Sequence, residues 1–213
     1  MSELYIDKIT VGAIDTNCYF VVCKDTEQLA IVDPGADGKR IAAKIKEAGW
    51  QPTMILNTHG HWDHIGANKY LQDQFSIPIF IHEADLDYLS DAGLSMAAWL
   101  GSDGDGGICQ KPLADGDEIK LGRLSMQVIH TPGHTPGGVS FYLPQQQILL
   151  CGDTLFDHSI GRTDLPGGDM DLILESISKR LFVLPDAVIA YPGHGPETTI
   201  GEEKKGNPFV KAI

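Results

Sequence analysis

Short apolar runs separated by glycine- and proline-containing loops follow one another along the first half of the chain. Such runs predict strands, whereas the spacing of Ile41, Ile45 and Ala48 predicts an amphipathic helix. A second helix is expected to begin near His64 and to end at about Phe75. The pattern therefore predicts helices at 38–49 and 64–75, and strands at 4–10, 17–23, 28–32, 53–57 and 78–82.

The same alternation returns in the second half of the chain, after an irregular stretch at 91–112 that we interpret as a mobile insertion. No linker separates the two similar halves, roughly 1–90 and 113–213, so we expect a single α/β domain over residues 1–213. The second half is predicted to hold strands at 118–121, 124–129, 138–143, 147–150 and 187–191, and a helix at about 169–182.

The composition is that of a globular protein, with 213 residues of which 42% are hydrophobic and 21% are charged. The formal net charge of −13 argues against nucleic acid or an anionic membrane as the main partner. An anionic small molecule is compatible with this charge, because bound dications reverse the sign locally. We expect a small-molecule substrate and a monomer or small homo-oligomer.

We expect neither a signal peptide nor a membrane-spanning segment, since the sequence has no basic segment followed by a long apolar run. The four cysteines show no CxxC pattern and no disulfide-framework spacing. A cytoplasmic protein with reduced and mostly buried cysteines is therefore expected. A disulfide between Cys18 and Cys23 is the less favoured alternative.

The segment Thr58-His59-Gly60-His61-Trp62-Asp63-His64 contains three imidazoles and a carboxylate in close succession. Residues i and i+2 of an extended loop project to the same side, so His59 and His61 can share one ion. The turn into the next helix directs Asp63 and His64 to a nearby point, where a second ion could bind. Imidazole and carboxylate suit Zn, Fe or Mn, whereas burying these groups without a cation would be costly.

Further ligand-type side chains follow apolar runs later in the chain, each in a loop with glycine. Sheet-based enzymes commonly place their chemistry in such loops at strand ends. Asp33 is expected to brace its loop by hydrogen bonding rather than to bind an ion, and His82 to act as a cap. The later loops are Thr131-Pro132-Gly133-His134-Thr135, Cys151-Gly152-Asp153-Thr154 and Tyr191-Pro192-Gly193-His194-Gly195.

Together these motifs resemble those of the metallo-β-lactamase-fold hydrolases, over nearly the whole chain. Within that superfamily the chain is most similar to the short glyoxalase II-like (hydroxyacylglutathione hydrolase) proteins. The resemblance implies a four-layer αββα sandwich with the metal site at one edge of the two sheets. It is carried, beyond the histidine motifs, by Gly152-Asp153-Thr154-Leu155-Phe156, Gly161-Arg162-Thr163-Asp164 and Asn207-Pro208-Phe209.

The resemblance also implies a ligand set for two divalent metal ions, with zinc expected first and iron or manganese as alternatives. Asp153 would bridge the two ions. The aspartate bridge and the lack of a cysteine at any ligand position differ from typical metallo-β-lactamases. The first ion would be held by His59, His61 and His134, and the second by Asp63, His64 and His194.

The implied activity is hydrolysis of a thioester such as S-lactoylglutathione by a hydroxide shared between the two ions, with Asp63 orienting it. A thiolate leaves without a strong general acid. In the family, a basic residue nine positions after the bridging aspartate contacts glutathione, and Arg162 stands at that spacing. A salt bridge from Arg162 to Asp164 is an equally weighted alternative. Longer glyoxalase II enzymes have a tyrosine at the position that Asp164 occupies in this chain.

Three other functions remain open from the sequence. One is a persulfide (sulfur) dioxygenase with a single iron, which shares the fold and a Gly-Arg-Thr-Asp segment. Another is a lactonase of the same fold, and the least favoured is a non-catalytic zinc-stabilised protein. Met96 and Trp99 are expected either to form an apolar wall beside the metal site or to belong to an ordinary surface helix.

Overall fold

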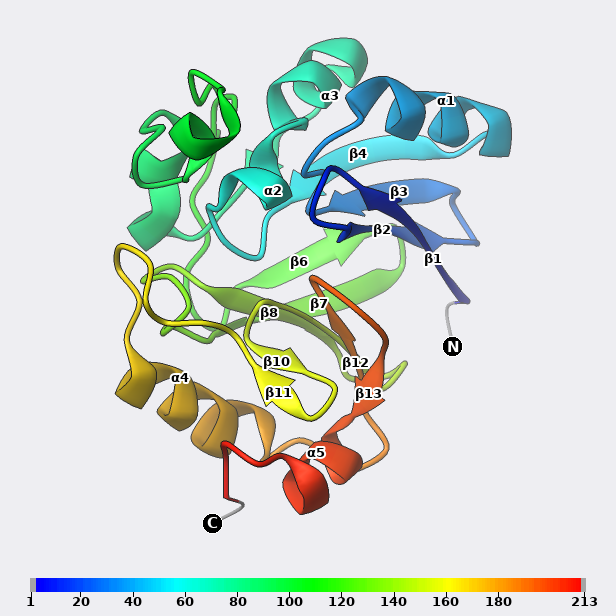
Figure 1. Ribbon diagram of the computed structural model, residues 1–213. Coiled ribbons are helices and arrows are strands. Elements are labelled where there is room, and N and C mark those ends of the chain that lie inside the picture. The colour runs from blue at the N-terminus through cyan, green and yellow to red at the C-terminus, as the bar shows by residue number, and fades with distance from the viewer. Residues whose placement is uncertain (1–2, 212–213) are drawn as a thin grey trace.

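The first sheet is built from the N-terminal half of the chain in the computed structural model, which describes residues 3–211 (Figure 1). Across the sheet the strands are β1 (Leu4–Val11), β2 (Thr16–Cys23), β3 (Gln28–Val32), β4 (Gln51–Leu56) and β5 (Ile79–Phe80). The first three are antiparallel, whereas β3, β4 and β5 run parallel. The carboxyl ends of these last three strands therefore meet at one edge of the sheet.

The second sheet is built from the C-terminal half. Its strands, in spatial order, are β13 (Thr198–Thr199), β12 (Ile189–Pro192), β9 (Ile148–Gly152), β8 (Val139–Leu143), β7 (Leu124–His130) and β6 (Glu118–Leu121). β8 is antiparallel to both β7 and β9, and β12 is parallel to β9. Consequently β7, β9 and β12 point the same way and also end at a common edge.

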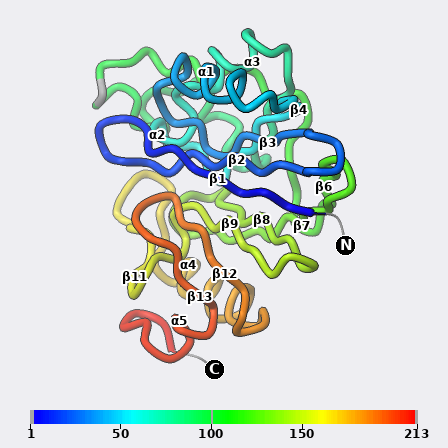
Figure 2. The backbone as a smooth tube through the Cα atoms, turned by 90° about the vertical axis from the view of Figure 1, so that its right-hand side faces the viewer, coloured from blue at the N-terminus to red at the C-terminus, as the bar shows by residue number. Residues whose placement is uncertain are grey.

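Helices cover the outer face of each sheet, so the molecule has the four αββα layers that the resemblance implied (Figures 1 and 2). On the first sheet lie α1 (Gly38–Ala48) and α3 (Asn68–Phe75). On the second lie α4 (Met170–Ser176), its π-helical extension Ile177–Leu181, and α5 (Ile200–Gly206). The short α2 (Trp62–Ile65) lies at the strand-end edge of the first sheet.

The core between the sheets follows the two-residue period of the strands. In β2, Tyr19 and Val21 belong to the cluster shared with Phe141 of the second sheet. Phe20 and Val22 of the same strand pack instead in the cluster under α1. All these side chains are buried, which explains why β2 reads as a continuous apolar run rather than as an alternating one.

The prediction of one helix over 64–75 is wrong in one respect, because two short helices, α2 and α3, occupy this segment. The chain breaks at Gly66 and Ala67, and the Ala67 amide donates to the carbonyl of Pro34. A Cβ on Gly66 would lie 2.4 Å from the carbonyl oxygen of Gly35, so only glycine allows this approach. The contact ties α2 to the loop after β3, which no local periodicity could reveal.

Several smaller elements are absent from the sequence-based prediction. The hairpin of β10 (Leu155–Phe156) and β11 (Ser159–Ile160) has two-residue strands, too short for a periodic signal. The strand predicted at 78–82 is shorter in the structure, where it is β5, and the strand predicted at 187–191 begins two residues later and ends one residue later as β12. The helix expected at 169–182 is α-helical only to Ser176.

The four cysteines are free, so the disulfide considered between Cys18 and Cys23 is wrong. Cys18, Cys23 and Cys151 are buried, and Cys109 is partly exposed. Across residues 3–211, none of the helices has both the length and the apolar character that crossing a membrane requires.

From the core between the sheets we expect two phenylalanine-to-alanine variants to differ in their free energy of unfolding. Phe141 is fully buried between the sheets, whereas Phe209 is 54% exposed. We expect Phe141→Ala to lower the free energy of unfolding by about 3–5 kcal/mol, because it removes buried surface and leaves a cavity. Phe209→Ala is the control and should change it by less than about 1 kcal/mol. Urea unfolding followed by circular dichroism measures both, and equal losses would contradict the assigned core.

Candidate metal centre

Ligand-type side chains gather where the strand ends of the two sheets face each other. In the first sheet, the segment 58–64 follows β4 and leads into α2. In the second sheet, loops after three strands of common direction approach the same place. These loops carry His134 after β7, Asp153 after β9 and His194 after β12.

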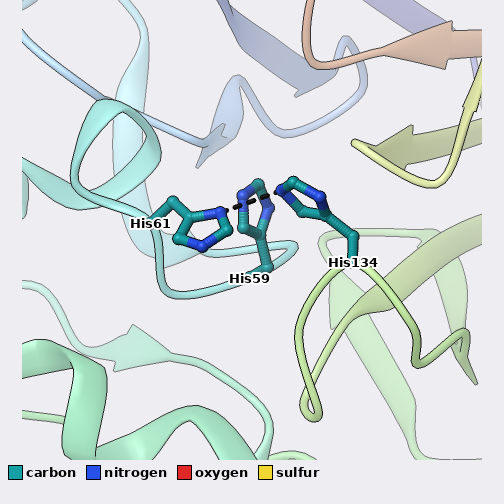
Figure 3. Close-up of side chains that lie close together, drawn as sticks. All are labelled: His59, His61 and His134. Atoms are coloured by element: carbon teal, nitrogen blue, oxygen red, sulfur yellow. Dashed lines mark hydrogen bonds between the residues drawn. The ribbon is translucent and has the colours of Figure 1, made fainter. Parts of the chain in front are cut away.

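The first group consists of His59, His61 and His134, whose rings converge (Figure 3). One ring nitrogen from each lies within 4.8 Å of the others, and all three residues are buried. Nδ1 of His61 approaches Nε2 of His134 to 2.9 Å. His59 and His61 thus project to one side, as their i, i+2 spacing predicted.

The second group consists of Asp63, His64 and His194. Oδ2 of Asp63 lies 3.2 Å from Nε2 of His64 and 3.2 Å from Nε2 of His194. Asp153 lies between the groups: its Oδ2 is 3.6 Å from Nε2 of His134 and 3.5 Å from Nε2 of His194. A Cβ on Gly193 would lie 2.1 Å from Oδ1 of Asp153, so glycine is required where this loop passes the centre.

Several buried polar atoms at this junction have no hydrogen-bond partner. Leaving one such atom unpaired costs about 1–3 kcal/mol. A divalent cation would satisfy these atoms together, and imidazole nitrogen with carboxylate oxygen is a suitable donor set for it. The unpaired atoms that face the two groups are Nε2 of His59, Nε2 of His61, Nε2 of His64 and Oδ1 of Asp153, whereas Nδ1 of His64 lies 3.0 Å from Oδ2 of Asp33.

Hydrogen bonds from Nδ1 of His134 and of His194 determine which ring nitrogen faces the centre. Nδ1 of His134 donates to the carbonyl oxygen of Arg162 at 2.8 Å, and Nδ1 of His194 to that of Ile14 at 3.1 Å. A carbonyl only accepts, so Nδ1 carries the hydrogen in both rings and Nε2 offers its lone pair inward. Such outer contacts orient metal-binding imidazoles and determine their tautomer.

Asp33 braces the first loop, as expected from the sequence. Its Oδ1 accepts from the amide of Thr58 at 2.8 Å and its Oδ2 from the Thr58 hydroxyl at 2.6 Å. Because that hydroxyl hydrogen points to Asp33, its oxygen accepts from Nδ1 of His59 at 3.1 Å. Asp33 and Thr58 together therefore turn Nε2 of His59 toward the centre. His82 is also a cap, since its Nδ1 accepts from the amide of Ala84.

The protonation states favour cation binding. Burial lowers the pKa of His59 and lowers that of His61 to about 3, so both rings are neutral near pH 7. Burial alone would raise the pKa of Asp63, but His64 and His194 hold it well below its usual value. Burial also opposes charge on His64 and His194, yet the neighbouring carboxylates raise the pKa of both rings. These carboxylates therefore favour a positive charge at the second group, which a metal ion would supply in place of the ring protons.

Asp85 is a further residue of the site that the sequence reasoning missed. It is fully buried in the 3-10 helix Glu83–Leu89, and its carboxylate joins the two histidine loops. Oδ2 accepts from the amide of Gly60 at 2.9 Å and from the Thr135 hydroxyl at 2.7 Å, and Oδ1 accepts from the amide of Gly137 at 2.6 Å. An aspartate in an unremarkable polar stretch gave no sequence signal for this role.

A cleft of about 420 Å³ opens over the two groups. Met96 and Trp99 line it, and the exposed Trp99 lies in the 3-10 helix Ala97–Leu100, so this surface helix also forms a wall beside the site. Arg162 lines it as well, but its guanidinium pairs with Asp164, with Nε to Oδ1 at 2.7 Å and Nη2 to Oδ2 at 2.8 Å. The salt-bridge alternative for Arg162 is therefore confirmed.

A family model of the metallo-beta-lactamase superfamily matches residues 11–194. The chain belongs to this superfamily. A probable metallo-hydrolase of Bacillus subtilis (strain 168), YqgX, is 39% identical over 211 residues, 97% of each chain. The hydroxyacylglutathione hydrolase GloC of Haemophilus influenzae is 34% identical over 209 residues, 97% of this chain and 98% of that relative.

Two solved structures support the same superfamily. The B3 metallo-beta-lactamase BLEG-1 superposes with a TM-score of 0.92 at 39% identity, covering 97% of this chain and 99% of that one. TTHA1623 in a di-iron-bound form superposes with a TM-score of 0.87 at 37% identity, covering 96% and 100%. The expected fold is thereby confirmed, and the superfamily together with the clustered His and Asp side chains implies a metallohydrolase that uses divalent ions.

Because Asp85 joins the two histidine loops, we expect its removal to lower both the stability of the protein and its retention of metal. Asp85→Ala leaves three donors on two loops without an acceptor, so we expect the free energy of unfolding to fall by about 3 kcal/mol or more. We also expect metal to be lost during dialysis, because the loop of His59 is no longer fixed to that of His134. Asp87→Ala, an exposed carboxylate in the same helix, is the control. Wild-type stability and metal content in Asp85→Ala would refute this role.

Proposed function

We propose that the protein is a binuclear metal-dependent hydrolase that cleaves a thioester such as S-lactoylglutathione. The observation that carries the proposal is the position of Asp153, between two groups that each offer three donor side chains at the base of one cleft. Such spacing suits two ions sharing one carboxylate. The similarity to a hydroxyacylglutathione hydrolase supports the choice of a thioester.

In this proposal His59, His61 and His134 would hold one ion, Asp63, His64 and His194 would hold the other, and Asp153 would be shared between them. Zinc is the expected metal, because no redox step is needed for hydrolysis. Iron and manganese suit the same donors, and the similar chain TTHA1623 was crystallised with two irons.

When bound, the two ions would supply an ionised water at neutral pH and would polarise the substrate carbonyl. The chain's own residues position these partners. Asp63 is ionised, and its Oδ2 is held by a hydrogen bond from the Thr16 hydroxyl at 3.0 Å. The fixed carboxylate can accept a hydrogen bond from the attacking water and orient it toward the carbonyl carbon. The neutral rings of His59 and His61 serve as ligands and not as acids.

The lining of the cleft favours a thiolate as the leaving group. Apart from the proposed ligands, its polar side chains are Ser95, Arg162 and the two indoles of Trp62 and Trp99. None of these is a carboxylic acid, a lysine or a free histidine that could protonate an amine or alkoxide as it departs. A thiolate leaves without such help, so a thioester matches the groups that the cleft presents.

Hydrolysis of a β-lactam is a second candidate, because the B3 metallo-beta-lactamase BLEG-1 is similar over nearly the whole chain. The ring amide of a β-lactam is also attacked at its carbonyl carbon. Its nitrogen must be protonated as the ring opens, and the cleft lining offers no acid for this outside the proposed ligands. We therefore place it second.

Metal content tests the binuclear arrangement directly. We expect about two equivalents of metal per wild-type chain and about one in His194→Ala, because the second group loses one of its three donors. His130→Ala, which removes a histidine outside the cleft and outside every potential ligand group among the described residues, should keep about two equivalents. Inductively coupled plasma mass spectrometry after dialysis measures this. One equivalent in the wild type would favour a mononuclear enzyme such as a persulfide dioxygenase.

Loss of thioester absorbance from S-D-lactoylglutathione tests the activity, using zinc- or iron-loaded protein and a chelator-treated control. We expect metal-dependent turnover, and Asp63→Asn should lower kcat by about 100-fold or more, since it weakens both a ligand and the orientation of water. A chromogenic cephalosporin is assayed in parallel. Cephalosporin cleavage with an inert thioester would overturn the proposal in favour of the β-lactam candidate.

A further inference from the structure

Apart from the proposed ligands, Ser95 and Arg162, the walls of the cleft are formed by large apolar or aromatic side chains. They are contributed by segments far apart in the chain: the β1–β2 turn, α2, the stretch 91–100, the β10 strand and the loop after Arg162. Six large apolar side chains face the same space. They are Ile14, Trp62, Met96, Trp99, Phe156 and Leu165.

Two of these side chains are unusually exposed for their size. Trp99 is 78% exposed and Ile14 is 53% exposed, and both border the opening over the metal groups. Adjacent exposed apolar surface of this kind commonly marks a binding site. The segment that carries Trp99 is also anchored, because the amide of Trp62 donates to the carbonyl of Ser95 at 2.7 Å. Met96 next to it adopts a left-handed φ of 65°, a conformation that side chains rarely keep without a local constraint.

The charges of the cleft do not suit an anionic carrier. Among its lining residues, Arg162 is the single arginine or lysine, and Asp164 already occupies its guanidinium with two hydrogen bonds. Away from the metal groups, the net charge of −13 offers no general attraction to an anionic carrier. A glutathione carrier brings two carboxylates, and the walls offer no unpaired guanidinium or ammonium for either of them.

We propose that the cleft selects thioesters by an apolar, uncharged acyl group, such as an arylacyl or branched alkylacyl group, and not by the charges of the thiol carrier. This inference rests on the proposed thioester hydrolysis. The acyl carbon is the atom attacked, so the acyl group must lie within the cleft beside Trp99 and its neighbours. A long carrier can instead extend past the rim into solvent.

A matched pair of substrates tests the inference on the metal-loaded enzyme. The S-acetyl and S-phenylacetyl thioesters of N-acetylcysteamine share one uncharged carrier and differ only in the acyl group. We expect kcat/KM to be more than about tenfold higher for the phenylacetyl ester. Trp99→Ala should remove most of this preference by lowering kcat/KM for the phenylacetyl ester. Phe209→Ala, an exposed aromatic outside the cleft, is the control and should keep the wild-type ratio.

A second variant tests the charge argument independently. Asp164→Asn weakens the pair and frees the guanidinium of Arg162, so it should raise kcat/KM for S-lactoylglutathione about two- to fivefold at low salt. The gain should vanish at high salt and should not appear for the phenylacetyl ester. An unchanged kcat/KM for S-lactoylglutathione in Asp164→Asn would overturn the charge argument.

The outcomes separate the two proposals. Equal kcat/KM for both cysteamine esters, or a preference unaffected by Trp99→Ala, would overturn the acyl-group inference while thioester hydrolysis stands. Loss of all metal-dependent activity on the cysteamine esters and on S-lactoylglutathione would instead refute the proposed function itself. Faster turnover of S-lactoylglutathione than of the phenylacetyl ester would also overturn the inference, because recognition would then rest on the carrier.

Discussion

The burial of mutually unsatisfied imidazoles and carboxylates between two sheet edges is the constraint on which this structure depends. Nε2 of His59, Nε2 of His64 and Oδ1 of Asp153 are enclosed by protein yet have no hydrogen-bond partner within it. The cost of several such atoms is comparable to the whole stability of an ordinary domain. A bound divalent cation would satisfy these atoms, and its binding free energy would then add to the stability of the fold.

The two sheets bring these groups together through strand direction rather than through sequence proximity. β3, β4 and β5 end at one edge of the first sheet, and β7, β9 and β12 end at the matching edge of the second. Hydrogen bonds then fix the loops that follow. Asp33 and Thr58 orient His59, while Asp85 ties the amide of Gly60 to the loop of His134. The site is consequently a property of the interface between the halves, and neither half alone has all its donors.

Much of this was predictable, because it rests on local patterns. Most strands of both sheets contain apolar runs that predict them, and the His59–His64 segment has metal-ligand residue types at a spacing that places them on one side. Contacts between distant segments were not predictable in this way. The break between α2 and α3 depends on the Pro34 carbonyl, and the role of Asp85 depends on donors from two other loops.

Arg162 shows how a residue can matter for a reason other than the expected one. Its side chain was expected to meet either a carboxylate of the substrate or Asp164, and it forms the second contact. Its backbone carbonyl, which carries no sequence information, accepts from Nδ1 of His134 and so directs Nε2 of that ring to the centre. The loop that contains Arg162 and Asp164 therefore serves the metal groups through its main chain. Its side chains form their own salt bridge at the rim of the cleft, so in this loop the main chain orients the metal groups and the side chains shape the cleft.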